Sequence, residues 1–182
     1  MQYKKNKTLN ILTTLLILIP MLGWAGISVN SDHGSLQGLG HAKSHDFPVI
    51  AEQFSLTLGD ADSNGVRQVK AMIPVAEIST GNFMRNAHMR MAMFSGDYPE
   101  IIFSANVTLP ELAKGIYPLN GTLTINGIAK PYNLEIKLDQ AGHQWHATGK
   151  FVIVPTDFDM GLPGMGPMKV QDHVDLNLDV TF

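Results

Sequence analysis

The chain has 182 residues, of which 16 are Asp or Glu and 13 are Lys or Arg, and it contains no Cys. This length fits a single domain with a buried core, and the formal charge of −3 argues against a nucleic-acid-binding protein. With 45% hydrophobic and 16% charged residues, the composition is not that of a disordered chain. The lack of Cys excludes disulfides, thiol catalysis and Cys-ligated metal centres.

The first 25 residues have the order of a secretory signal peptide. Three lysines lie within the first seven residues, an apolar run covers residues 9–24, and the small residues Gly23 and Ala25 suit the two key positions before a cleavage site. We expect residues 1–25 to be removed. The alternative is an uncleaved anchor, because the uncharged stretch Thr8–Val29 is long enough to cross about 30 Å of hydrocarbon.

The remaining segment, residues 26–182, is expected to form one domain. It keeps all 16 acidic residues but only 10 of the 13 basic ones, which gives a net charge of −6. Such a surface is not attracted to anionic lipid headgroups over long distances. We therefore expect no stable membrane insertion once the signal has been cleaved.

Most of residues 26–182 have the period-two alternation of half-buried β-strands. The alternation is clearest at 132–138 and 174–182, and further strands are expected at 54–58, 66–75, 101–107, 119–125 and 145–154. Asn126-Gly127 and Ala141-Gly142 suit short turns between antiparallel strands. About eight such strands predict an all-β fold, an extended antiparallel eight-stranded β-barrel that is large enough to hold a small ligand.

Residues 81–94 break this period. The segment has apolar residues at three- and four-residue steps, and Thr80 or Asn82 can cap its start. We expect a short amphipathic helix packed against the barrel through Phe83, Met84, Ala87, Met91 and Phe94. Its methionines suit either irregular gaps in a core or an apolar binding site.

The alternation also predicts which side chains face the inside of the barrel. Both a filled core and a lined cavity require apolar residues at these positions, so the pattern leaves the two alternatives open. The inward positions expected from the pattern are Phe54, Leu56, Phe103, Leu123, Leu134, Ile136, Phe151, Ile153, Val174 and Leu176.

Four strings occur in a fixed order along the second half of the chain. They are ISTGNFMRNAHM at 78–89, YPEIIFS at 98–104, GTLTINGIAKP at 121–131, and TDFDM followed by KVQDHV within 156–174. Together they resemble the YceI-like family of periplasmic polyisoprenoid-binding proteins. Two positions depart from its pattern, because Asn86 replaces a usual acid and Ala129 a usual Thr.

The resemblance implies a lipocalin-like barrel with an apolar tunnel that holds an isoprenoid tail and leaves the polar head near an opening. It adds Met84 and Phe158 to the expected tunnel wall. Arg85 and His88, three apart on one face of the expected helix, could hold a pyrophosphate or a quinone carbonyl, and Tyr98 could donate a hydrogen bond at the mouth. The alternative is that these polar groups are merely solvated.

A metal site and a catalytic site are not expected. His41 and His45 are four residues apart, which in an extended strand separates them by about 13 Å, too far for one ion. No nucleophile-elbow, metalloprotease, P-loop or dinucleotide-binding motif occurs.

The sequence therefore predicts a non-enzymatic periplasmic carrier of an isoprenoid lipid, such as ubiquinone or a polyprenyl phosphate, with no other cofactor. Two alternatives stay open: a stress-related interaction module with a filled barrel core, and an enzyme that acts on such a lipid. The oligomeric state also stays open, with a homodimer among the options.

Overall fold

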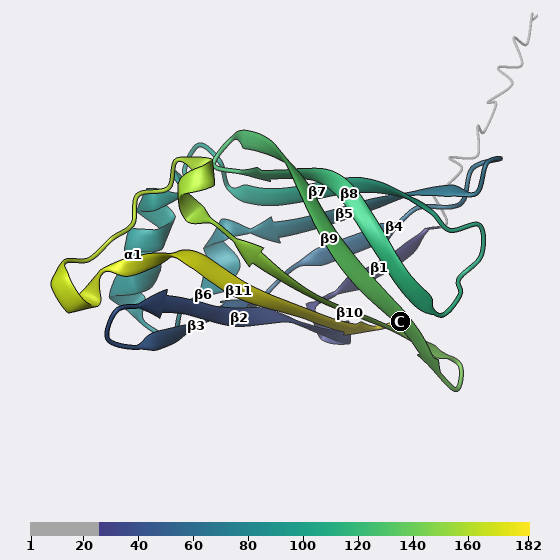
Figure 1. Ribbon diagram of the computed structural model, residues 1–182, viewed down its shortest axis with the longest axis horizontal. Helices are drawn as coiled ribbons and strands as arrows, with labels where there is room; N and C mark the ends of the chain where they lie inside the picture. The colour runs from purple at the N-terminus through teal and green to yellow at the C-terminus, as the bar shows by residue number, and fades with distance from the viewer. Residues whose placement is uncertain (1–25) are drawn as a thin grey trace, which may run out of the picture.

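The computed structural model describes residues 26–182, so the expected signal segment 1–25 lies outside the described residues. Eleven strands form one antiparallel sheet in the order β1-β4-β5-β7-β8-β9-β10-β11-β2-β3-β6 (Figure 1). The strands are β1 (Ile27–Asn30), β2 (Gly34–Ala42), β3 (Asp46–Ala51), β4 (Ser55–Leu58), β5 (Val66–Pro74), β6 (Ile78–Ser79), β7 (Glu100–Thr108), β8 (Gly115–Ile125), β9 (Ile128–Ala141), β10 (Gln144–Ile153) and β11 (Val170–Thr181).

One α-helix, α1 (Phe83–Ala92), lies at one end of the curled sheet (Figure 1). Four short 3₁₀ turns complete the described elements: η1 (Ser31–His33), η2 (Val75–Glu77), η3 (Pro155–Phe158) and η4 (Gly166–Met168). Within residues 26–182, no helix has the length and hydrophobicity needed to cross a bilayer.

The all-β antiparallel fold with one short helix is confirmed, but the prediction of a closed eight-stranded barrel is wrong. The described sheet has eleven strands and is open, with β1 and β6 as its edges. The unexpected strands lie mainly in residues 27–51. There β2 carries Gly34, Gly38 and Gly40, and β3 carries Pro48, residue types that are depleted in strands and weaken the alternation.

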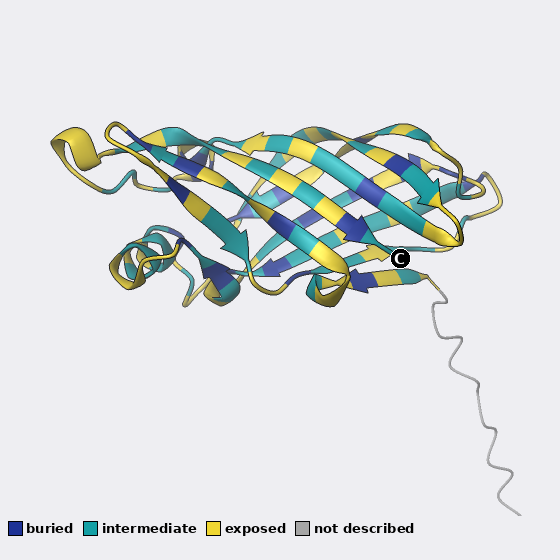
Figure 2. Cartoon of the chain, turned by 90° about the horizontal axis from the view of Figure 1, so that it is seen from below, coloured by how far each residue is buried: buried dark blue, intermediate teal, exposed yellow. Residues whose placement is uncertain are grey.

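The predicted alternation of buried and exposed residues is present along the long strands (Figure 2). In β8, Leu119, Leu123 and Ile125 are buried while Asn120 is exposed. At the end of β8, Asn126 and Gly127 have φ angles of 54° and 72° and connect to β9, which confirms that turn. The sheet thus has one apolar inner face and one mixed outer face.

The helix is confirmed, and the Asn82 side chain caps it by accepting a hydrogen bond from the Arg85 backbone N–H. The expected packing face is wrong, however, because Phe83 and Met84 on α1 are 82% and 61% exposed. Two polar contacts fix the rotation of the helix. The Asn86 side-chain oxygen accepts hydrogen bonds from the Thr80 backbone N–H and hydroxyl, and the Arg90 guanidinium donates to the Ala76 carbonyl.

The face of α1 that is turned inward carries Arg85, Met89, Ala92 and Met93. This spacing of four, three and one residues is itself a helical stripe. The sequence contains both stripes, and the polar contacts of Asn86 and Arg90 select the second.

The packing of β2 against β11 can be tested where their backbones approach closely. A Cβ atom on Gly38 would lie 1.7 Å from the backbone oxygen of Asp175. We expect Gly38→Ala to lower the free energy of unfolding by about 1–3 kcal/mol, because the two strands must move apart. Urea unfolding followed by circular dichroism measures the change.

Gly96→Ala is the matched control, since a Cβ atom at position 96 would meet nothing within 4 Å and its φ is not positive. Equal unfolding midpoints for the two variants would contradict the packing described for β2 and β11.

Candidate functional site

The curled sheet encloses a cavity of about 330 Å³ on its inner face. This volume lies in the range of about 300–1,000 Å³ that is typical of small-molecule sites. Strands supply most of the wall, and α1 and residues 160–163 contribute at one end. Nine side chains expected to face inward line the cavity: Leu56, Phe103, Leu123, Leu134, Ile136, Phe151, Ile153, Val174 and Leu176.

Three residues expected in the wall lie elsewhere. Phe54 is buried in the core just before β4, and Phe158 is buried in η3, where its carbonyl accepts a hydrogen bond from the Asn126 side chain. Met84 is exposed on the outer face of α1, because the helix is rotated by its polar anchors.

Other residues of the cavity wall lie outside the set expected from the sequence. They include Val69 and Ala71 on β5 and Met89 on α1. The strand at 66–75 was predicted, so its alternation could have identified Val69 and Ala71. The position of Met89 depends on the rotation of α1, which hydropathy does not fix.

The wall is almost entirely apolar, and its polar members are Thr57, Thr80, Arg85, Tyr117 and Tyr132. Both tyrosine hydroxyls are already used, because Tyr117 donates to the Ala113 carbonyl and Tyr132 to the Val152 carbonyl. Burial raises the pKa of Tyr132, so this hydroxyl stays protonated. Arg85 is the one charged group among the described wall residues.

Three neighbours hold the Arg85 guanidinium in place at the wall. It donates to the Thr80 carbonyl at 3.0 Å, lies 4.2 Å above the ring centroid of Phe47, and is 3.5 Å from His45 Nε2. The cation–π contact and the hydrogen bond orient the charge without neutralising it. A fixed guanidinium in an apolar wall can bind an anionic or carbonyl group of a ligand.

The other two residues expected at the polar head do not reach the cavity wall. His88 is exposed on α1 and is not among the residues that line the cavity. Tyr98 is 44% exposed and packs beside Gly127, where an added Cβ would come within 2.4 Å of the tyrosine ring. Of the three residues, the structure places only Arg85 at the cavity.

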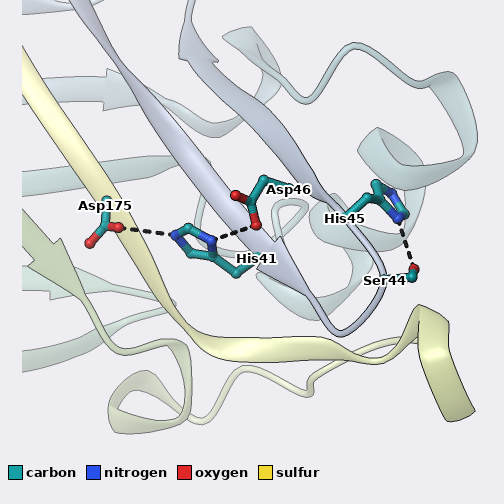
Figure 3. A network of polar contacts seen from close by, with 5 residues as sticks. All are labelled: His41, Ser44, His45, Asp46 and Asp175. Atoms are coloured by element: carbon teal, nitrogen blue, oxygen red, sulfur yellow. Dashed lines mark hydrogen bonds and ion pairs between the residues drawn. The ribbon is translucent and has the colours of Figure 1, made fainter.

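A second polar cluster lies on the outer face of the sheet, centred on His41 of β2 (Figure 3). Its Nδ1 is 2.7 Å from an Asp46 carboxylate oxygen and its Nε2 is 3.0 Å from one of Asp175. The hydrogen bond to Asp46 is the main cause that raises the pKa of His41, against the opposing effect of burial. His45 is not part of this cluster and contacts Ser44 instead (Figure 3).

The His41 and His173 rings also stack, with centroids 4.4 Å apart. Spacing along the sequence pairs His41 only with His45 and does not reveal His173 as a neighbour. Alternation along β11 places His173 and Asp175 on one face, but the pairing of β11 with β2 is a long-range contact that spacing alone does not reveal.

A model of the YceI-like domain matches residues 28–182. No curated protein sequence matches the chain.

Among the solved structures with a similar fold, three come from different organisms. Burkholderia cenocepacia BcnA has a TM-score of 0.67 and 19% identity, over 82% of this chain and 96% of that one. A polyisoprenoid binding domain from Saccharophagus degradans, implicated in plant cell wall breakdown, has a TM-score of 0.61 and 13% identity, over 81% and 92%. A Campylobacter jejuni YCEI protein has a TM-score of 0.57 and 17% identity, over 74% and 82%. At identities this low, the similarity establishes the fold alone.

The cavity can be tested without knowing its natural ligand. Ala71 lines the wall, whereas its neighbour Lys70 is exposed on the outside of β5. We expect Ala71→Trp to fill the cavity and weaken binding of the apolar fluorophore N-phenyl-1-naphthylamine by about tenfold or more, a loss of about 1.4 kcal/mol. A fluorescence titration measures the dissociation constant.

Lys70→Trp is the matched control and should bind the fluorophore like the unmodified protein. Ala71→Leu, a smaller filling change, serves if Ala71→Trp does not fold. Unchanged binding in a folded Ala71 variant would mean that the fluorophore does not enter this cavity.

Proposed function

The chain belongs to the YceI-like family, and on this basis we propose that it is a periplasmic carrier that binds an isoprenoid lipid in its cavity and is not an enzyme. Its ligand would be an isoprenoid quinone such as ubiquinone, or a polyprenyl phosphate. The single observation that carries this proposal is the cavity of about 330 Å³, with an apolar wall and one charged side chain, Arg85.

The apolar wall favours a ligand whose affinity comes mainly from its tail. Burying one methylene-sized group is worth about 0.8 kcal/mol, so a five-carbon isoprene unit contributes about 4 kcal/mol before costs. Five such units reach about 20 kcal/mol, close to the ceiling for non-covalent binding. The cost of ordering the tail offsets much of this. Affinity should therefore depend more on the tail than on the head group.

The related structures support the same class of ligand. The Saccharophagus degradans protein with a similar fold is described as a polyisoprenoid binding domain. At this low identity the similarity shows the fold alone and does not indicate which residues bind the ligand. The nine predicted wall residues and Arg85 are therefore assigned to ligand binding as part of this proposal.

The assignment to the periplasm rests on the sequence of residues 1–25, which has the order of a signal peptide. A periplasmic location also suits a domain without Cys, which folds equally well under oxidising conditions.

The two alternative functions have less support from the geometry. A filled interaction module would need side chains in the space that the cavity occupies. An enzyme would need a nucleophile with a nearby base, but the described wall places no His, Lys, Asp or Glu beside Thr57 or Thr80. The first observation favours binding over a filled interaction module, and the second favours binding over catalysis.

The contribution of Arg85 to binding affinity can be measured separately from that of the lipid's apolar tail. We expect Arg85→Met to weaken binding of a polyprenyl phosphate by about 10- to 100-fold, because a hydrogen bond to a charged group contributes about 1.5–3 kcal/mol. Binding of the uncharged polyprenol of equal length should change little. Displacement of N-phenyl-1-naphthylamine by each lipid measures both affinities.

Lys150→Met is the control, since Lys150 is an exposed cation on β10 that does not line the cavity. Equal effects of Arg85→Met on the two lipids would refute the head-group role of Arg85. Failure of both lipids and of ubiquinone to displace the fluorophore from the unmodified protein would refute the carrier itself.

A further inference from the structure

Three potential metal ligands meet on the outer face of the sheet. They are His41 on β2 and His173 and Asp175 on β11, and their ligand atoms all lie within 4.8 Å of one another. Among residues 26–182 this is the one group of three or more such side chains. We propose that these three residues bind a divalent transition-metal ion, Zn²⁺, with a fourth position open to solvent.

The strand arrangement brings the ligands together without a loop. β11 pairs with β2, with Asp175 opposite Leu39, and residues 173 and 175 alternate onto the same outer face. The register of β11 against β2 shifts between Val170 and Val174, a segment that contains His173. Such irregularities re-aim side chains and are frequent next to functional sites.

The distances suit one small ion. Ligand bonds to zinc of about 2.0–2.2 Å place tetrahedral ligand atoms roughly 3.3 Å apart. His41 Nε2 and the Asp175 carboxylate are already 3.0 Å apart. His173 completes the set by closing from at most 4.8 Å, which side-chain rotation can supply.

Asp46 orients the central ligand. Its carboxylate is 2.7 Å from His41 Nδ1, and in the tautomer that carries the proton on Nδ1 the other ring nitrogen, Nε2, faces Asp175. Metal-binding histidines in proteins typically donate their second ring N–H to a carboxylate in this way. A neutral imidazole has one N–H and cannot donate to both carboxylates, and an ion at Nε2 would take the place of the second proton.

The charge and ligand chemistry select the kind of ion. Two carboxylates, Asp46 and Asp175, lie at the site, and in the described part of the chain the only ion-pair partner of either is His41. Two imidazole nitrogens and one carboxylate oxygen favour zinc or its transition-metal neighbours over Mg²⁺ and Ca²⁺, which take oxygen ligands. None of the three ligands lines the cavity, so this inference does not depend on the carrier proposal.

The experiment is a zinc titration of untagged full-length protein that has been treated with a chelator and then freed of it. We expect one Zn²⁺ per chain in isothermal calorimetry. His173→Ala and Asp175→Asn should each weaken binding by about 100-fold or more, and Asp46→Asn by about 10- to 100-fold through loss of orientation. Saturating zinc should also raise the Tm of the unmodified protein but not that of Asp175→Asn.

His146→Ala is the matched control. His146 Nε2 contacts the Asp179 carboxylate at 2.7 Å on the neighbouring pair of strands, but no third ligand joins this pair among the described residues. This variant should bind zinc like the unmodified protein. Circular dichroism spectra show that each variant is folded.

Two results would overturn the proposal. One is the absence of zinc binding by the unmodified protein at micromolar concentrations. The other is equal zinc affinity in folded His173→Ala, Asp175→Asn and His146→Ala variants, which would indicate unspecific surface binding. An anomalous diffraction peak between His41 and Asp175 in zinc-soaked crystals would support it.

Discussion

Burial of apolar side chains on one face of a single continuous sheet is the constraint on which the rest of the structure depends. Each strand places every second side chain inside, and the sheet must curl to remove that face from water. Residues such as Leu109, Ile125 and Val180 are buried from water. The curled inner face is nevertheless wider than its side chains can fill, and a cavity remains beside them. An apolar tail placed there would supply contacts that the empty space lacks.

The same alternation of side chains along each strand places polar and charged groups on the outer face of the sheet. Outward positions carry polar and charged residues, and pairing between distant strands brings some of them together, as with His41 and Asp175. The inner and outer faces can therefore serve different ligands on the same strands. Arg85 joins the inner site from outside the sheet, because α1 lies across one end of the cavity.

The sequence was informative wherever local pattern decides the structure. Alternation predicted the long strands and nine wall residues, and Asn126-Gly127 predicted its turn. Prediction failed where long-range or polar contacts decide. The glycine-rich β2 forms because its neighbours pair with it, and the rotation of α1 depends on the Asn86–Thr80 hydrogen bonds. His173 reaches His41 through pairing between strands that are far apart in the chain.

The central claim is that the cavity holds an isoprenoid lipid. The most direct measurement is organic extraction of protein purified from its native source without detergent, followed by mass spectrometry of the extract. We expect a long isoprenoid quinone or polyprenyl phosphate at close to one molecule per chain. An extract free of isoprenoids, from protein that also fails to bind added ubiquinone, would contradict it.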